Sequence, residues 1–232
     1  MAETRSRPGR AHDAEGSREA ILDAAEKVFA EHGFDGARID VIAAEAGYNK
    51  SLIFQYFGDK FNLYVQVIRR ADEQTRGLQT EIVTALRDTD PGPDAAAHYR
   101  ALFRSFLGGY FDYLIEHPSL MRILLWEMAE GWQTYAKLIT QLDTDDVEQI
   151  KPMLDKVRDA GLFRSDFEPM AQIVLVEMLF PCFLASIPLC RILGVGEDLS
   201  SPTALARARE YFVDFAVHAV MVEPPHNDPN RD

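Results

Sequence analysis

Glycines divide residues 18–57 into three helical segments, and this division limits the folds that the chain can adopt. In the first segment, residues 18–32, apolar side chains recur every three or four positions, at Ile21, Leu22, Ala25, Val28 and Phe29. Ser17 stands where it can cap this segment by accepting hydrogen bonds from first-turn amides. Gly33 follows at the position where many helices end in a left-handed residue. We therefore expect a helix with both ends defined by the sequence.

Two shorter helical segments, residues 38–46 and 50–57, follow and share one tight turn. Gly47 permits that turn, because it adopts backbone angles that strain other residues. Asn49 is a favoured N-cap for the third segment, and Gly58 ends it. Two short helices joined by a glycine-containing turn, after a capped first helix, are typical of a helix-turn-helix unit.

The rest of the chain has helical periodicity almost throughout, without a convincing alternating strand. We expect the later helices to cover residues 60–87, a segment that stops before Pro118, two or more segments within 119–160 with a break near Gly131, residues 170–193 and residues 202–222. The helix over residues 170–193 carries only two charges and is expected to be buried on more than one side, with kinks at Pro181 and Pro188.

These patterns predict an all-α fold with two domains. Residues 17–60 form an N-terminal three-helix helix-turn-helix domain, and residues 61–222 form a larger helical domain. Residues 1–16 and 223–232 lack periodicity, so we expect a disordered arm and a disordered tail. The arginines of the arm, Arg5, Arg7 and Arg10, are either inert or reach the minor groove of DNA.

The net charge of -13 argues against binding to nucleic acid, since phosphate contacts need Lys and Arg. Residues 1–60 carry 8 Lys and Arg against 11 Asp and Glu, so any DNA-binding surface must be a local patch. The longest uncharged apolar run, residues 178–190, is shorter than the about 20 residues that cross a bilayer. Without a secretory signal, we expect a cytoplasmic protein that does not enter the membrane, with Cys182 and Cys190 as buried thiols.

Motifs of common enzymes are missing from the sequence. It has no P-loop, no Gly-x-Ser-x-Gly elbow and no His-Glu-x-x-His pair. The six histidines are scattered, and structural or solvated roles suit them best. We expect a protein that is not an enzyme and that needs no cofactor and no metal.

The stretch GFDGARIDVIAAEAGYNKSLIFQYFGDKFNLY resembles the TetR family of bacterial transcriptional regulators. The Ile42–Ala43 pair, the Ala46–Gly47 turn, the aromatic third helix and the Gly-Asp-Lys exit match the family in order and spacing, and the match covers residues 18–64. The remainder looks like the family's effector-binding and dimerisation region. The resemblance implies that residues 61–222 bind a ligand and dimerise through the last two helices.

A major groove about 12 Å wide admits one α-helix, which enters by its N-terminal end. Lys50 can pair with a phosphate or with guanine, and Gln55 can read adenine. With the family match, the expected DNA-binding residues are Arg38, Tyr48, Asn49, Lys50, Ser51, Gln55, Tyr56 and Lys60. Other interpretations stay open: both lysines could be merely solvated, Tyr56 could only pack, and Gln55 could be exposed without touching a base.

Two positions depart from the family pattern. Phe54 stands where the family usually has a tyrosine whose hydroxyl contacts a phosphate, and Tyr56 can supply that hydroxyl instead. Arg38 stands where the family usually has Ser or Thr, so a cap is lost and a charge near the phosphates is gained. Whether Phe54 leaves a phosphate contact unmade is open.

The larger domain concentrates aromatic and soft apolar side chains, which form either an ordinary core or, as the resemblance implies, part of a cavity. The expected ligand-binding residues are Phe103, Phe106, Tyr110, Trp126, Trp132, Met178 and Phe183. The expected dimer interface comprises Val174, Leu175, Tyr211, Phe212 and Phe215.

The sequence thus predicts a ligand-responsive transcriptional regulator. We expect a homodimeric repressor that a small apolar or aromatic effector releases from a palindromic operator in double-stranded DNA. An activator of the same fold is an alternative, and so is an all-helical carrier or enzyme with a hydrophobic ligand. The capped three-helix start disfavours the carrier and the enzyme, because neither needs that spacing.

Overall fold

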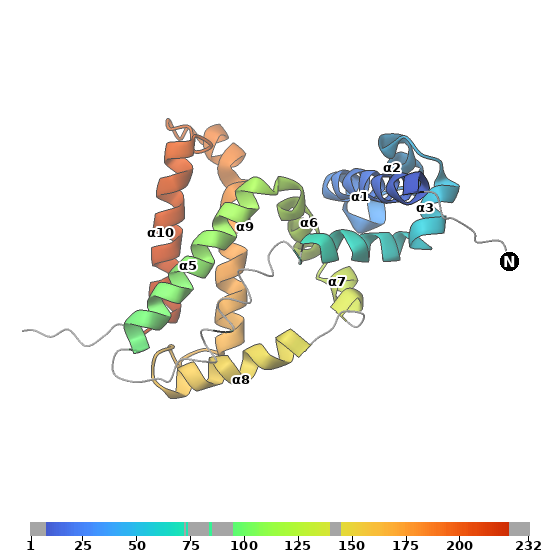
Figure 1. Cartoon of the computed structure of the whole chain (residues 1–232). Helices are drawn as coiled ribbons and strands as arrows, with labels where there is room; N and C mark the ends of the chain where they lie inside the picture. The colour runs from blue at the N-terminus through green and yellow to red at the C-terminus, as the bar shows by residue number, and fades with distance from the viewer. Residues whose placement is uncertain (1–7, 72, 74–83, 85–94, 140–144, 223–232) are drawn as a thin grey trace, which may run out of the picture. The chain divides into compact units, whose positions relative to one another are not determined.

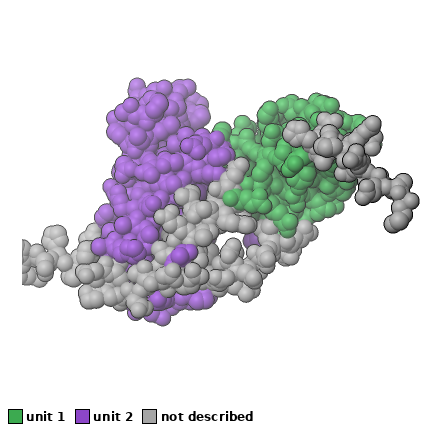
Figure 2. Space-filling view, in the orientation of Figure 1, with its two compact units in different colours: residues 1–74, 118–138 green, residues 75–117, 139–232 purple. Residues whose placement is uncertain are grey.

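The computed structural model describes residues 8–71, 73, 84, 95–139 and 145–222, which belong to two compact units. Unit 1 comprises residues 1–74 and 118–138, and unit 2 comprises residues 75–117 and 139–232 (Figure 2). The described residues are helical and contain one isolated β-bridge, between Phe163 and Met221, but no strand. The prediction of an all-α fold is confirmed.

Unit 1 contains the three predicted N-terminal helices and two helices from the middle of the chain (Figure 1). Its helices are α1 (Pro8–Gly36), α2 (Ile39–Ala46), α3 (Lys50–Phe57), α6 (Pro118–Ala129) and α7 (Gln133–Ile139). Residues 60–71 are also helical, whereas most of the predicted remainder of that helix, residues 72–87, lies outside the described residues. Residues 1–7 and the predicted tail, residues 223–232, lie outside them as well.

The ends of these helices follow local signals. Gly33 (φ 67°) breaks α1, and Gly47 (φ 73°) ends α2 in the left-handed conformation. The Asn49 side chain accepts a hydrogen bond from the Leu52 amide at 2.9 Å, so it caps α3 as predicted. The start of α1 differs from the prediction, because the helix begins at Pro8 and includes part of the predicted arm.

An aromatic cluster forms the centre of unit 1. Phe29 and Tyr64 are fully buried, and their rings meet edge to face at 4.9 Å. The ring centroid of Phe34 lies 5.2 Å from that of Tyr64 and 6.1 Å from that of Phe61. Edge-to-face aromatic pairs stabilise a core beyond their buried area, so this cluster holds α1 against the helix over residues 60–71.

Helix α6 packs along α1, although many residues separate the two in sequence. The Trp126 indole donates a hydrogen bond to the Ala30 carbonyl at 3.2 Å. A side chain at Gly33 would meet the same indole at 3.1 Å, so the glycine allows the close approach. The compact unit therefore differs from the predicted division at residue 60, since residues 118–138 belong with the N-terminal helices.

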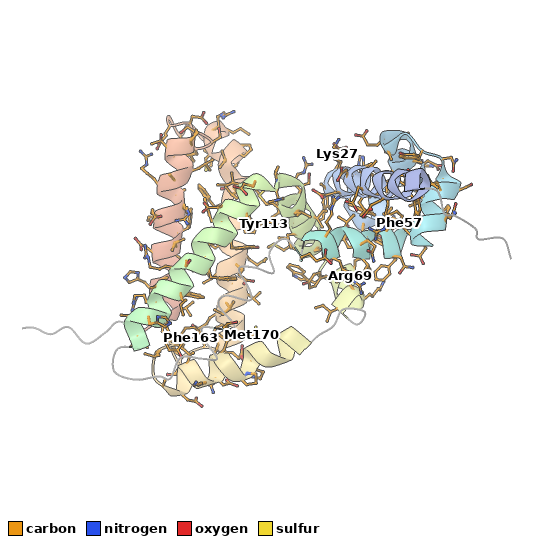
Figure 3. The ribbon with its side chains drawn as sticks, in the orientation of Figure 1. Lys27, Phe57, Arg69, Tyr113, Phe163 and Met170 are labelled. Atoms are coloured by element: carbon orange, nitrogen blue, oxygen red, sulfur yellow. The ribbon has the colours of Figure 1, made fainter. Side chains whose placement is uncertain are left out.

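Unit 2 contains four described helices: α5 (Ala95–Glu116), α8 (Asp145–Asp159), α9 (Pro169–Ile192) and α10 (Pro202–Val220). Helix α10 packs against α5 and α9, and α8 packs against α9 (Figure 1). Phe111 and Phe180 are fully buried, with ring centroids 5.4 Å apart. Phe163, which is labelled in Figure 3, packs its ring against that of Phe103 and forms the isolated β-bridge with Met221. Glu168 caps α9 by accepting a hydrogen bond from the Ala171 amide at 2.8 Å.

Helix α9 is much less covered than the sequence suggests. Among the described residues it is the one helix long and apolar enough to cross a membrane by length and composition. Its most apolar stretch of 18 residues has a mean hydropathy of 2.2, but only 17% of that stretch is buried. One such helix is weak evidence for a membrane span. The predicted burial on several sides is wrong for the single protomer, because periodicity shows that a helix is apolar but not what covers it.

The two cysteines lie on this helix. Cys182 is exposed and Cys190 is partly exposed, so the prediction of two buried thiols is also wrong for the protomer. The physical reason is the same, since an apolar sequence around a cysteine does not show whether other helices cover its side chain.

Candidate nucleic-acid interface

Helices α2 and α3 are held by a small buried set, which leaves the N-terminal end of α3 free. Ile42 and Ala43 of α2 and Ile53 and Phe57 of α3 are buried. The Arg18 guanidinium lies over the ring of Phe57, which is labelled in Figure 3, at 5.4 Å from the ring centroid. Because Ile53 and Phe57 are one turn apart on the core side, Phe54 and Gln55 between them are exposed.

The predicted DNA-binding residues lie on that outer surface. Six of them have exposed side chains: Arg38, Tyr48, Asn49, Lys50, Ser51 and Gln55. Tyr56 is partly buried, with its ring 6.2 Å from that of Phe57. The first six are thus accessible, and all but Gln55 lie at or just before the start of α2 or α3, whereas Tyr56 also packs. Contact with DNA stays a prediction for each of them.

Lys50 has a partner that the sequence analysis did not identify. Its ammonium lies 2.6 Å from the Asp40 carboxylate, which belongs to the first turn of α2. Both side chains are about half exposed, so water screens the pair and little energy holds it. A phosphate can therefore replace Asp40 as the partner of Lys50 at low cost.

The Lys60 side chain is partly buried and contacts the end of α1. Its ammonium donates a hydrogen bond to the Asp35 carbonyl at 3.2 Å and lies 4.6 Å from the Phe34 ring centroid. Partial burial lowers the pKa of Lys60, and the Asp35 and Glu130 carboxylates oppose that shift. In this arrangement Lys60 stabilises the end of α1, and its predicted contact with the DNA backbone stays a prediction.

Phe54 is 44% exposed, although it is a large apolar residue in the middle of α3. It lies one turn after Lys50, so the two side chains share a side of the helix. A phenyl ring has no hydrogen-bonding group, so it cannot make the phosphate contact of a tyrosine hydroxyl.

A buried carboxylate beneath the helix-turn-helix was not recognised from the sequence. Glu127 is 2% exposed and accepts hydrogen bonds from the Tyr64 hydroxyl at 2.5 Å and from the Tyr135 amide at 3.0 Å. Burial and the nearby Glu127 carboxylate raise the pKa of Tyr64 far above its ordinary value, so the hydroxyl stays protonated and donates. The one sequence signal for this site was an acidic residue, Glu127, on a mostly apolar helix. The spacing of residues along the chain did not identify Tyr64 as its partner.

The predicted ligand-binding residues fall into two groups. Trp126 and Trp132 belong to unit 1, where Trp126 packs on α1. The other five belong to unit 2: Phe103, Phe106, Tyr110, Met178 and Phe183. Phe103 is buried, whereas the remaining four are partly exposed. The prediction of a ligand site in unit 2 therefore rests on these five.

Unit 2 also holds an acid in an apolar setting. Glu177 is the only acidic residue of α9 and is partly buried. Desolvation raises the pKa of its carboxyl group to about 7. The side chain is therefore partly protonated near neutral pH, when it can either donate or accept a hydrogen bond.

The predicted dimer residues are mostly exposed in the protomer. Leu175 is 63% and Tyr211 66% exposed, while Val174 and Phe215 are also exposed. Phe212 is partly buried against Phe183, at 4.5 Å between ring centroids. Four of the five are thus exposed side chains of α9 and α10, whereas Phe212 packs on Phe183.

This geometry is that of a helix-turn-helix DNA-binding protein with a helical body. The model of bacterial regulatory proteins of the tetR family matches residues 21–67, and the model of tetracyclin repressor-like C-terminal domains matches residues 100–216. The chain belongs to the TetR family. Its members are transcriptional regulators rather than enzymes; they bind operator DNA, act as dimers and respond to small molecules.

Individual relatives agree with this assignment. The HTH-type transcriptional repressor NicS of Pseudomonas putida is 30% identical over 71% of this chain and 74% of its own length. The HTH-type transcriptional activator FasR of Mycolicibacterium smegmatis is 30% identical over 61% of this chain and 59% of its own. A TetR family regulator from Marinobacter aquaeolei has a similar fold, with a TM-score of 0.62 over 92% of this chain and 100% of that one, at 19% identity. The carrier and enzyme alternatives gain no support.

Proposed function

We propose that this chain is a homodimeric repressor that binds a palindromic operator through Arg38, Tyr48, Asn49, Lys50, Ser51, Gln55, Tyr56 and Lys60. The observation that carries the proposal is the exposed, polar N-terminal end of α3, which Asn49 caps and a buried core holds in place. Because this end is a local patch on an acidic protein, the rest of the surface repels DNA and favours a single mode of docking.

Fluorescence anisotropy with the DNA upstream of the chain's own gene tests this function. Specific binding should weaken linearly in log affinity against log salt, because phosphate contacts release counterions. Lys50→Ala should weaken binding and reduce the salt slope by about 1 for each protomer. If the chain prefers no duplex over random DNA, it does not act through this surface.

Lys27→Ala is a matched control. Lys27 is also an exposed lysine of unit 1 paired with one acid, with its ammonium 3.3 Å from Glu45. It lies on α1, outside the proposed surface, so its loss should leave the affinity for DNA close to that of the wild type. Equal losses from both lysines would mean that only overall charge matters.

The proposed dimer forms through α9 and α10, at Val174, Leu175, Tyr211, Phe212 and Phe215. Its support is the exposed apolar surface of these helices, which a second copy would remove from water. Two α3 helices can then occupy half-sites one or two turns of DNA apart, as a palindrome requires. A protein that reaches the chromosome in this way acts in the bacterial cytoplasm.

Light scattering at micromolar concentration tests the dimer. Leu175→Glu should yield a monomer, because two carboxylates would lose water in the interface. Ile115→Glu is the control, since Ile115 is an exposed apolar residue of α5, outside the proposed interface. A wild-type monomer would contradict this arrangement.

The proposed effector is a small apolar or aromatic molecule that binds unit 2 near Phe103, Phe106, Tyr110, Met178 and Phe183, with Trp126 and Trp132 as the less supported members. Its binding favours a dimer whose α3 spacing no longer fits the groove. The coupling is reciprocal, so a true effector raises the melting temperature and weakens operator binding, and operator DNA weakens effector binding by the same factor. Compounds that only raise the melting temperature are ligands but not effectors.

Activation is the second candidate, because FasR, a relative 30% identical over 61% of this chain, is named an activator. A reporter fused to the operator separates the two. Deletion of the gene raises expression from a repressed promoter and lowers it from an activated one.

A further inference from the structure

Helix α3 presents three sides, each defined by its contacts. Ile53 and Phe57 face the core of unit 1. Ser51 and Gln55 are exposed and one turn apart on a second side. Lys50 and Phe54 share the third side. The first side stabilises the domain, so the other two are available to DNA.

The third side faces the same way as the start of α2. Lys50 reaches the Asp40 carboxylate at 2.6 Å, and Asp40 lies in the first turn of α2. The starts of both helices meet the DNA in a helix-turn-helix unit, because α3 enters the groove and α2 crosses the backbone. Phe54 therefore lies on the DNA side of α3 rather than on its solvent side.

Among the described residues of unit 1, the core leaves the Phe54 side chain uncovered. Its side chain is 44% exposed. The neighbouring rings of Tyr56 and Phe57 pair with each other, whereas Phe54 forms no ring pair within the part of the chain that the structure describes. The Phe54 ring is therefore an apolar surface of α3 that the core of unit 1 leaves exposed.

We propose that Phe54 is a specificity-determining residue, whose ring packs against the C5-methyl group of a thymine in the major groove of each operator half-site. The methyl group of thymine is the apolar feature that a base edge presents in that groove. A phenyl ring recognises it without a hydrogen bond and rejects cytosine, which lacks the methyl group. This inference rests on the proposed function, since it names the base feature that the same surface reads.

The test replaces thymine by deoxyuridine, which keeps its base pairing and loses only the methyl group. An operator is first enriched from random duplexes with the full-length protein. Each thymine is then replaced in turn, at equivalent positions of both half-sites, and the Kd is measured by anisotropy at one salt concentration for the wild type and for Phe54→Ala.

One pair of equivalent thymines should weaken wild-type binding by roughly tenfold to twentyfold, because each lost methyl contact costs about fourfold in affinity. The same replacement should leave the Kd of Phe54→Ala unchanged. Phe54→Leu, which keeps an apolar side chain, should retain part of the sensitivity. Because Phe54 is exposed, both variants should melt near the wild-type temperature.

Two results overturn the assignment. Either no deoxyuridine position weakens the wild type, or the sensitive position is equally sensitive in Phe54→Ala. A uniform loss of affinity in Phe54→Ala, without any such position, would assign the ring to the sugar-phosphate backbone instead. Failure to enrich any duplex is a different outcome, because it removes the proposed DNA-binding function itself.

Discussion

Tyr64→Phe should destabilise unit 1 measurably, although it removes a single oxygen atom. The Tyr64 hydroxyl donates to the Glu127 carboxylate at 2.5 Å, and both side chains are 2% exposed or less. Without that donor, Oε1 of a buried carboxylate loses the hydrogen bond from Tyr64. A hydrogen bond to a charged group contributes about 1.5–3 kcal/mol, so we expect a loss of about 2 kcal/mol.

The assay is thermal unfolding at a fixed protomer concentration, because a dimer melts at a temperature that depends on concentration. For a chain of this size, about 2 kcal/mol corresponds to a fall of roughly 4–8 °C in Tm. Tyr48→Phe is the matched control, since Tyr48 is exposed and its substitution should change the stability by less than about 0.5 kcal/mol.

Glu127→Gln completes a double-mutant cycle. In that background the acceptor is neutral, so Tyr64→Phe should cost about 1 kcal/mol rather than 2. If Tyr64→Phe melts like Tyr48→Phe, the hydrogen bond contributes nothing and the reasoning from its burial fails. Equal costs of Tyr64→Phe in both backgrounds would show that the charge of Glu127 is irrelevant.

Three further substitutions test other features by the same melts. Asn49→Ala should cost about 1 kcal/mol through loss of the α3 cap, and operator affinity should fall with it; unchanged stability would contradict the cap. Gly33→Ala should destabilise more than Gly47→Ala: both have positive φ, but only at Gly33 would the added Cβ meet neighbours, Glu130 Oε1 at 3.0 Å and the Trp126 ring at 3.1 Å. Glu177→Gln should be as stable as the wild type near pH 4.5, where the Glu177 carboxyl group is protonated in the folded protein. As the pH rises through about 7, the buried carboxyl group must ionise and the wild type loses stability, whereas the glutamine cannot ionise. The variant should then be the more stable of the two by roughly 1–3 kcal/mol. A difference that does not grow between pH 5 and pH 8 would refute the burial of that carboxyl group.

The features that the sequence predicted well are local ones. Gly33 and Gly47 adopt positive φ angles, and Asn49 caps α3, because each signal involves residues only a few positions apart. Likewise, the break near Gly131 separates α6 from α7, and the helix before Pro118 ends at Glu116. The helix-turn-helix and its exposed edge follow from such signals in sequence order.

The features that were missed depend on distant contacts. The pairing of Lys50 with Asp40 requires the turn between α2 and α3 to be folded, and spacing alone does not give it. The packing of Trp126 on α1 joins residues far apart in the chain, so Trp126 was grouped by composition with the aromatics of unit 2. The exposure of Cys182 and of α9 was missed because apolar content does not say whether a helix is covered by its own chain.

The membership of residues 118–138 in unit 1 has a consequence for engineering and for evolution by recombination. A chimera that joins residues 8–71 to the body of another regulator would lose the Trp126 donor to Ala30 and the Glu127 acceptor for Tyr64. The transplanted DNA-binding helices would then form an incomplete fold, unless the new body carries an equivalent tryptophan and acid. The exchangeable module is therefore discontinuous, and exchange of DNA specificity between such proteins should succeed more often by changing the surface of α3 than by splicing whole domains.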